Sequence, residues 1–276
     1  MDNEEFAKLY LDYYGYAVGT PRLNLRIAEF QSVHKLAPSG ELDSDTIDLM
    51  RQKRCGVRDN LVLSEEARWR KNRLNYFVES YVSILPSHIQ NAIFDAAFLS
   101  WQQVADLRFT PVASRESADL VISTGRGSRA GFDGPSGTLA WAELPQGNDR
   151  QLLMRFDLDE SWLAELSAAE RGIFLLNVAA HEFGHLIGLV HSRVQGALMA
   201  PFYSPRISKP QQSDDVPRIQ TLYGPATGMP GPTPIPTPVP GGSILRAIVE
   251  AVVEIVIKVL EGYVAKTPGK IDDLLV

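Results

Sequence analysis

The eleven residues HEFGHLIGLVH, His181 to His191, restrict most strongly what this chain can fold into. His181 and His185 are four residues apart, so on a helix both imidazoles project from the same face. Gly188 can adopt a positive φ, which ends the helix and lets the chain turn back until His191 reaches the same point. Three neutral imidazoles with an open fourth position are the ligand set of a catalytic zinc ion.

A carboxylate lies beside the first of these histidines. Glu182 is expected to face the open position, where it can take a proton from zinc-bound water. Met199 follows eight residues after His191, in the segment ALMAP. A bare HExxH arises by chance fairly often, and the alternative is a pair of core histidines on an apolar helix. The longer pattern HExxHxxGxxH with a downstream methionine rarely arises by chance, and it resembles the signature of the metzincin peptidases.

Composition narrows the remaining classes of function. A net charge of −6 argues against non-specific nucleic-acid binding. The single cysteine, Cys55, cannot form an intrachain disulfide. Only His34 and His88 lie outside the motif, so a second histidine-rich metal site cannot be built. The opening MDNEEFAKLY has no basic region followed by an apolar one, so no secretory signal is visible in this sequence.

Residues 1–59 are expected to form a small three-helix domain. Amphipathic patterns cover FAKLYLDYYGY, LNLRIAEFQSVHKL and SDTIDLMRQ. Ser44 or Asp45 can cap the third helix, and His34, on the second, is expected at the surface. The FQ pair, the G-x-L-D turn and the T-x-x-L-M helix resemble the peptidoglycan-binding-like propeptide of matrix metalloproteinases.

Residues 60–224 mix strand and helix patterns. Strands are expected at RWRKNRLNYFVESY, RFTPV, ADLVIST, TLAWAEL and QLLMRFDLDESW, the third of them central because it is almost entirely apolar. A long amphipathic helix is expected over PSHIQNAIFDAAFLSWQQVADL. The helix that carries the histidine motif is expected to start near Ser167, with Ser167 and Glu170 as a capping box. A last helix covers DDVPRIQTLYG.

Two different segments follow. Residues 225–242, PATGMPGPTPIPTPVPGG, form a Pro-rich linker that is expected to be extended. Residues 243–276 begin with a helical pattern. Five charges within 16 residues argue against a membrane-spanning helix: Arg246, Glu250, Glu254, Lys258 and Glu261. The wide apolar face of 243–264 is expected to be covered by copies of itself, by the rest of the chain, or by a membrane surface.

Across residues 1–224 the chain resembles a matrixin, or matrix metalloproteinase. The motifs that carry the resemblance occur in the order of the family: RCGV, FDGPSGTLA, FDLDESW, HEFGHLIGLVHS, ALMAP and DDVPRIQTLYG. The resemblance implies an α+β or α/β metzincin catalytic domain, with a twisted mixed five-stranded sheet and three helices, preceded by the three-helix prodomain. It also implies a secreted, extracellular zinc endopeptidase acting on protein or peptide substrates.

The resemblance assigns roles to the motif residues. It implies one catalytic zinc ion, bound by His181, His185 and His191. Glu182 is implied as the general base, and Met199 as a support beneath the ion that does not bind it. Extended substrate is implied to lie along the strand that contains Leu139 and Ala140. The wall of the specificity pocket is implied at Pro201, Phe202 and Tyr203.

Cys55 lies in RCGV, just before the predicted catalytic domain, where the family has its cysteine switch. The alternative is a small buried hydrophobic residue. A thiolate on the zinc fills the position that water and substrate need, so a self-inhibited zymogen is expected. Gly56 lets the backbone lie close to the cleft. Arg54 and Asp59 of the family motif remain and can pair.

Departures from the family pattern are informative as well. Lys53 and Arg58 replace two prolines of the switch segment. The positions of the family's second, structural zinc carry residues that are not plausible ligands, so that zinc is predicted absent: Arg126, Ser128, Trp141 and Arg155. The arginines and the tryptophan are expected to fill the space by stacking or by pairing with nearby acids.

The neighbouring calcium site is expected to be retained. Its carboxylates match Asp133, Asp157 and Glu160, and its backbone carbonyls match Gly134, Ser136 and Thr138. Six hard oxygens are what calcium prefers, and the alternative is a solvated acidic loop.

Two other function classes remain open. In one, the N-terminal segment is a working peptidoglycan-binding module that targets a wall-associated hydrolase. In the other, the chain is a latent, non-catalytic scaffold that acts through its C-terminal helix.

Overall fold

The computed structural model describes residues 1–16, 19–20, 22–61, 67–134, 137–165 and 172–227. Several predictions concern residues outside these ranges: the capping box at Ser167 and Glu170, the calcium ligand Ser136, the linker beyond residue 227 and the helix at 243–264.

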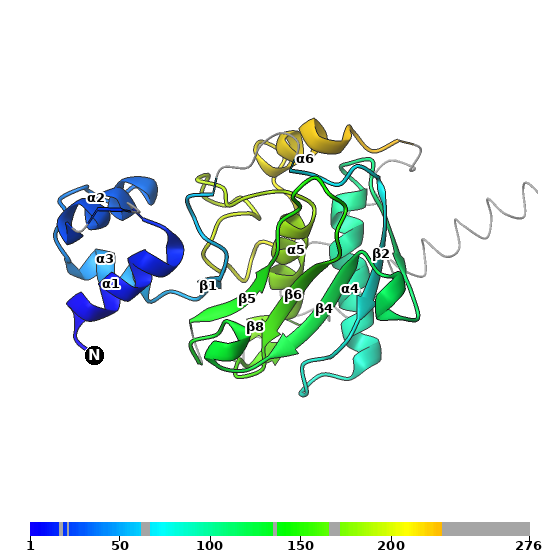
Figure 1. Ribbon diagram of the computed structural model, residues 1–276, viewed down its shortest axis with the longest axis horizontal. Coiled ribbons are helices and arrows are strands. Elements are labelled where there is room, and N and C mark those ends of the chain that lie inside the picture. The colour runs from blue at the N-terminus through cyan, green and yellow to red at the C-terminus, as the bar shows by residue number, and fades with distance from the viewer. Residues whose placement is uncertain (17–18, 21, 62–66, 135–136, 166–171, 228–276) are drawn as a thin grey trace, which may run out of the picture.

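Residues 1–59, the N-terminal unit, contain three helices with a small core of their own. They are α1 (Asn3–Tyr14), α2 (Leu23–Val33) and α3 (Ser44–Met50). Their apolar faces meet at Leu11, Ile27, Phe30 and Met50. The three predicted helices are therefore confirmed, and Figure 1 shows this unit, in blue, beside the larger one.

Two details of the N-terminal unit differ from the prediction. Asp43 caps α3, rather than Ser44 or Asp45, because its carboxylate accepts the backbone N–H of Thr46 at 2.8 Å. The surface position expected for His34 is also wrong. His34 lies just beyond the end of α2, and its side chain is only 10 % exposed because it turns inward toward a hydroxyl and a carboxylate.

The larger unit is built on a six-stranded sheet of order β1-β5-β6-β4-β2-β3. These strands are β1 (Arg54–Cys55), β5 (Thr138–Ala142), β6 (Leu152–Asp157), β4 (Leu120–Gly125), β2 (Arg73–Val78) and β3 (Arg108–Pro111). Only β5 and β6 pair antiparallel; the other neighbours run parallel.

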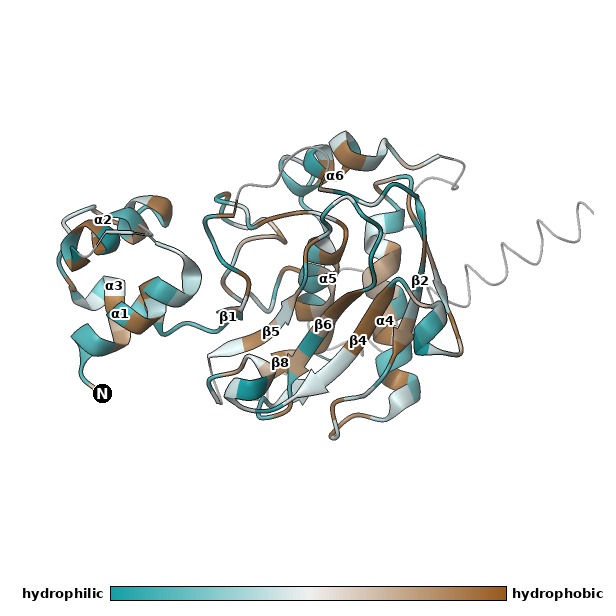
Figure 2. Ribbon diagram, viewed as in Figure 1, coloured by the Kyte–Doolittle hydropathy of each residue, from teal (hydrophilic) through white to brown (hydrophobic). Residues whose placement is uncertain are grey.

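All five predicted strands are present in this mixed sheet, and the sixth strand, β1, comes from the N-terminal unit. The apolar β4 lies inside the sheet as predicted. Figure 2 shows that hydrophobic residues concentrate on β4 and β6, in the middle of the sheet.

Three helices complete the larger unit within the described ranges: α4 (Ser87–Gln102), α5 (Leu175–Leu186) and α6 (Asp215–Tyr223). The rings of Phe98 on α4 and Phe183 on α5 stack with their centroids 3.7 Å apart. The hydroxyl of Tyr223 on α6 donates to the carbonyl of Ile187 at 2.9 Å. Packing on two sides therefore fixes α5, which carries the histidine motif. Short 3-10 turns lie at η1 (Arg115–Ser117) and η2 (Ser128–Ala130).

The predicted start of the motif helix near Ser167 is wrong. The helix begins at Leu175, directly after strand β8 (Ile173–Phe174), which pairs with β7 (Trp162–Leu163). Pairing keeps the backbone extended up to Phe174, and no side chain caps the helix there. All 12 residues of α5 are buried, including Asn177, His181 and His185, so its polar side chains face the interior and do not mark where the helix begins.

The first residues of the predicted linker lie against the larger unit. Pro225 forms a bridge with Ala105, and the Thr227 hydroxyl donates to Asp106 at 3.0 Å. Within the described ranges, none of the helices combines the length and the apolar character needed to cross a bilayer.

Candidate metal centre

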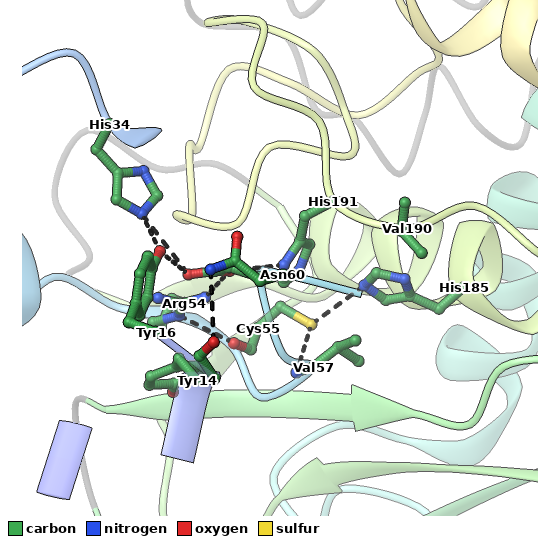
Figure 3. Close-up of polar contacts among 12 residues, drawn as sticks. Tyr14, Tyr16, His34, Arg54, Cys55, Val57, Asn60, His185, Val190 and His191 are labelled. Atoms are coloured by element: carbon green, nitrogen blue, oxygen red, sulfur yellow. Dashed lines mark hydrogen bonds and ion pairs between the residues drawn. The ribbon is translucent and has the colours of Figure 1, made fainter. Parts of the chain in front are cut away.

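Four buried side chains converge at one point, Cys55 from the N-terminal unit and three histidines from the larger unit: His181, His185 and His191. One ligand atom from each lies within 4.8 Å of all the others. His181 and His185 project from α5. Gly188 has a φ of +102°, which confirms the predicted reversal that brings His191 to the cluster. Figure 3 shows Cys55, His185 and His191 approaching one another.

The two helical histidines are oriented by backbone carbonyls. The Nδ1 atoms of His181 and His185 lie 2.7 Å from the carbonyl oxygens of Leu198 and Leu189. Because a carbonyl oxygen only accepts, each Nδ1 carries the hydrogen, and the two Nε2 lone pairs face one another 3.1 Å apart. Burial lowers the pKa of His181 to about 3 and that of His185 well below its usual range, so both imidazoles are neutral.

His191 and Cys55 complete an arrangement that resembles a tetrahedral zinc site. The Nε2 atom of His191 is buried and has no hydrogen-bond partner in the described chain. The Cys55 Sγ lies 3.4 Å from Nε2 of His185. In a tetrahedral zinc site with bonds of about 2.0–2.3 Å, neighbouring ligand atoms lie roughly 3.3–3.7 Å apart. Three inward-facing Nε2 atoms and one sulfur therefore fit a zinc ion.

Glu182 borders the same pocket as Cys55 and His181. It is fully buried, and neither carboxylate oxygen has a partner of ordinary hydrogen-bond geometry among the described residues. Burial raises the pKa of Glu182 to about 8, although contact with the Cys55 thiol partly lowers it. Burial, followed by the charge of Glu182, raises the pKa of Cys55 well above its usual range. A cation beside these two groups would favour the anionic form of each.

Met199 lies directly against the motif helix. It is fully buried, and a Cβ atom on Gly184 would lie 2.2 Å from its Sδ. Sequence reasoning missed Asp215, whose buried carboxylate accepts the N–H groups of Leu198 and Met199 at 2.7 and 3.2 Å. Asp215 thereby holds the turn whose carbonyl orients His181. In the sequence it appears only as an acidic residue at the start of a helix.

Residues 54–57, the RCGV motif and from here on the switch segment, lie in the cleft beside the histidines. Cys55 N–H donates to the carbonyl of Pro201 at 3.0 Å, and Gly56 N–H donates to that of Ala140 at 2.8 Å. A Cβ atom on Gly56 would lie 2.6 Å from a methyl group of Thr138, which confirms that glycine is needed for this close approach.

The predicted substrate residues surround this segment. Ala140, on β5, pairs with Cys55 of β1. The other four predicted substrate residues line a pocket together with Cys55 and Glu182: Leu139, Pro201, Phe202 and Tyr203. The switch segment thus occupies the surface that the sequence assigns to substrate.

Arg54 and Asp59 form the predicted ion pair, with side chains 1 % and 2 % exposed. The guanidinium also lies 3.5 Å from the centre of the Tyr14 ring. Two residues that sequence reasoning missed complete the cluster. The Tyr16 hydroxyl donates to Asp59, and Nε2 of His34 lies 2.6 Å from the same hydroxyl (Figure 3).

The positions expected for a second zinc hold a different set of contacts. The Arg155 guanidinium lies over the Trp141 ring at 5.7 Å, and Arg126 pairs with Asp159 at 2.7 Å. Ser128 begins η2. The predicted stacking and pairing are confirmed, and the residues present do not fit a zinc ion.

Metal analysis of the purified protein is therefore expected to give one zinc per chain, both for the full-length protein and after removal of residues 1–59. The reason is that two arginines and a tryptophan supply no zinc ligand at the second site. Inductively coupled plasma mass spectrometry measures the ratio. Two zinc ions per chain would contradict the loss of the second site.

The predicted calcium carboxylates form a crowded acidic cluster. Asp157 and Glu160 are buried, and one Asp157 oxygen has no hydrogen-bond partner in the described chain. Burial, with added repulsion from neighbouring acids, raises the pKa of Asp157 to about 6. Asp133 accepts the N–H of Thr138 at 2.8 Å, and Gly134 between them has a φ of +94°. Carboxylate oxygens are the kind of ligand that a hard cation prefers, and the Glu160 carboxylate also lies 3.5 Å from the Lys53 ammonium.

Comparison with known proteins gives a consistent result. Residues 68–224 match the Matrixin family model. An interstitial collagenase of Equus caballus is 39 % identical over 210 residues, covering 73 % of this chain and 43 % of the collagenase. A stromelysin-1 of Rattus norvegicus is 37 % identical over 214 residues, covering 74 % and 44 % of the two chains. This chain thus spans less than half the length of these curated relatives.

Proposed function

The chain belongs to the matrixin family, and from this membership and the metal-centre geometry we propose that it is a zinc-dependent endopeptidase held latent by its own N-terminal unit. Matrixins use a catalytic zinc ion and structural calcium. The observation that carries the proposal is the buried convergence of Cys55 with three histidines.

The proposed zinc ligands are the Nε2 atoms of His181, His185 and His191, with the Cys55 sulfur as fourth ligand in the latent form. When bound, zinc polarises the scissile carbonyl and lowers the pKa of a coordinated water toward about 7. Calcium is proposed to bind the carboxylates of Asp133, Asp157 and Glu160 and the carbonyls of Gly134, Ser136 and Thr138.

Glu182 is proposed to move the proton during hydrolysis. Once Cys55 has left the pocket, the carboxylate accepts a proton from the attacking water and delivers it to the leaving amine. Its buried position next to the histidines and its lack of a competing hydrogen-bond partner support this role. Met199 is proposed to support α5 by packing against Gly184. Asp215 is proposed to hold the turn whose Leu198 carbonyl orients His181.

The proposed substrate is an extended peptide that adds to β5 at Leu139 and Ala140. The pairing of β1 with this strand supports the proposal, because the edge already binds an extended backbone. Pro201, Phe202 and Tyr203 are proposed to wall the pocket for an apolar side chain. Family membership also supports a site of action outside the cell. Self-association or membrane-surface contact through 243–264 remains a proposal.

Replacing Cys55 with alanine is expected to release peptidase activity from the zinc-loaded full-length chain, by roughly tenfold or more, which corresponds to about 1.4 kcal/mol of lost inhibition. The thiolate then no longer fills the position that water needs. Hydrolysis of a quenched fluorescent peptide with an apolar residue at the cut measures the effect.

A thiol-blocking reagent is expected to activate the wild-type chain and to leave the Cys55→Ala variant unchanged, since Cys55 is the only cysteine. A zinc-loaded Cys55→Ala variant without peptidase activity would rule out the proposed function.

A further inference from the structure

The three ligand histidines differ in what orients them. His181 and His185 donate to carbonyls of the larger unit. His191 instead has its Nδ1 2.8 Å from Oδ1 of Asp59, a residue of the N-terminal unit 132 positions earlier in the chain. The second nitrogen of His191 faces the cluster without a partner among the described residues. One ligand is therefore oriented from outside the larger unit.

The Asp59 carboxylate is buried and is held by three side chains. Its Oδ1 accepts from both Arg54 and His191, and its Oδ2 accepts from the Tyr16 hydroxyl. Because the carboxylate oxygen that pairs with the Arg54 guanidinium acts as an acceptor, Nδ1 of His191 carries the hydrogen.

A chain of hydrogen bonds within the N-terminal unit fixes this carboxylate. Because the Tyr16 hydroxyl hydrogen points to Asp59, the hydroxyl oxygen accepts from Nε2–H of His34 at 2.6 Å. The His34 ring packs against Phe30 at 4.6 Å and against Phe202 of the larger unit at 5.0 Å. These contacts fix the Tyr16 hydroxyl that donates to Asp59, and Figure 3 shows Tyr16 and His34 on one side of His191.

We propose that Asp59 is a positioning residue for the metal: in the latent chain it orients and polarises His191 as a zinc ligand, so the N-terminal unit retains the zinc ion as well as blocking it. A carboxylate behind a ligand histidine fixes the tautomer and raises the basicity of the coordinating nitrogen. The inference rests on the proposed function, because it requires zinc on the three histidines. Removal of the N-terminal unit also removes this partner, so activation loosens the ion.

Zinc release from the full-length chain tests the proposal. The zinc-loaded protein is mixed with excess chromogenic chelator, and the release rate is recorded. Asp59→Asn is expected to release zinc about 10- to 100-fold faster, the usual effect of losing such a partner. Asp12→Asn is the matched control, since Asp12 pairs with Arg26 within the same unit, and it is expected to release zinc at the wild-type rate.

Zinc could also be released faster in Asp59→Asn because Cys55 binds it less tightly, and a second comparison tests this alternative. The double variant Asp59→Asn, Cys55→Ala is expected to release zinc faster than Cys55→Ala alone. In ¹⁵N-labelled zinc-loaded protein, the Nδ1–H resonance of His191 is expected to move in Asp59→Asn, while those of His181 and His185 stay in place.

The outcomes distinguish this inference from the proposed function. If the wild-type chain binds no zinc, the proposed function fails. If it binds zinc but Asp59→Asn releases the ion at the wild-type rate, the role of Asp59 is wrong and the proposed function stands. The same conclusion follows if the double variant releases zinc no faster than Cys55→Ala.

Discussion

Replacing Glu182 with alanine in the Cys55→Ala background is expected to lower kcat/KM for peptide hydrolysis by about 10²- to 10⁴-fold, the usual contribution of a positioned general base. The reason is that Glu182 is the buried carboxylate that borders the same pocket as His181 and Cys55 and lacks a competing hydrogen-bond partner in the described chain. Zinc content is expected to stay unchanged, because Glu182 is not among the four converging ligands.

The control for this variant is Glu116→Ala, which removes an exposed carboxylate and is expected to keep full activity. Peptide hydrolysis and zinc content are measured on the same preparations. Activity that persists in the Glu182→Ala variant would refute the proposed proton transfer, whereas loss of zinc together with activity would point to a structural role instead.

Replacing Arg54 with methionine is expected to weaken closure of the N-terminal unit by about 3–5 kcal/mol, the usual cost of removing one partner of a buried ion pair. Asp59 would then keep a buried charge without its guanidinium. Since about 1.4 kcal/mol corresponds to tenfold, the open population is expected to rise roughly 10²- to 4 × 10³-fold. The rate at which a thiol reagent modifies Cys55 measures this population.

Arg51→Met is the matched control, because the Arg51 side chain donates to the exposed Asn3 at 2.8 Å and lies over the half-buried Phe6 ring, both on α1. Its Cys55 is expected to react at the wild-type rate. A wild-type rate in the Arg54→Met variant would mean that the ion pair does not hold the switch segment closed.

The sequence predicts most of the elements of this fold, and its errors have identifiable causes. Strand positions follow from apolar runs, and the central place of β4 follows from its lack of polar residues. The start of α5 does not follow from the sequence, since the strand β8 directly before it is as apolar as the helix and no side chain caps the helix. The sequence does not reveal the burial of His34, because its partner Tyr16 lies 18 positions away, beyond the end of another helix.

The three histidines of the metal centre can be predicted from the sequence, because one helical turn and one glycine with positive φ place them through local geometry alone. Their surroundings follow from tertiary packing: Asp59 behind His191, Asp215 beneath the turn that carries Met199, and β1 as a sixth strand in the cleft. These contacts join segments far apart in the chain. Packing sets them, and no periodicity in the sequence encodes which distant side chains will meet.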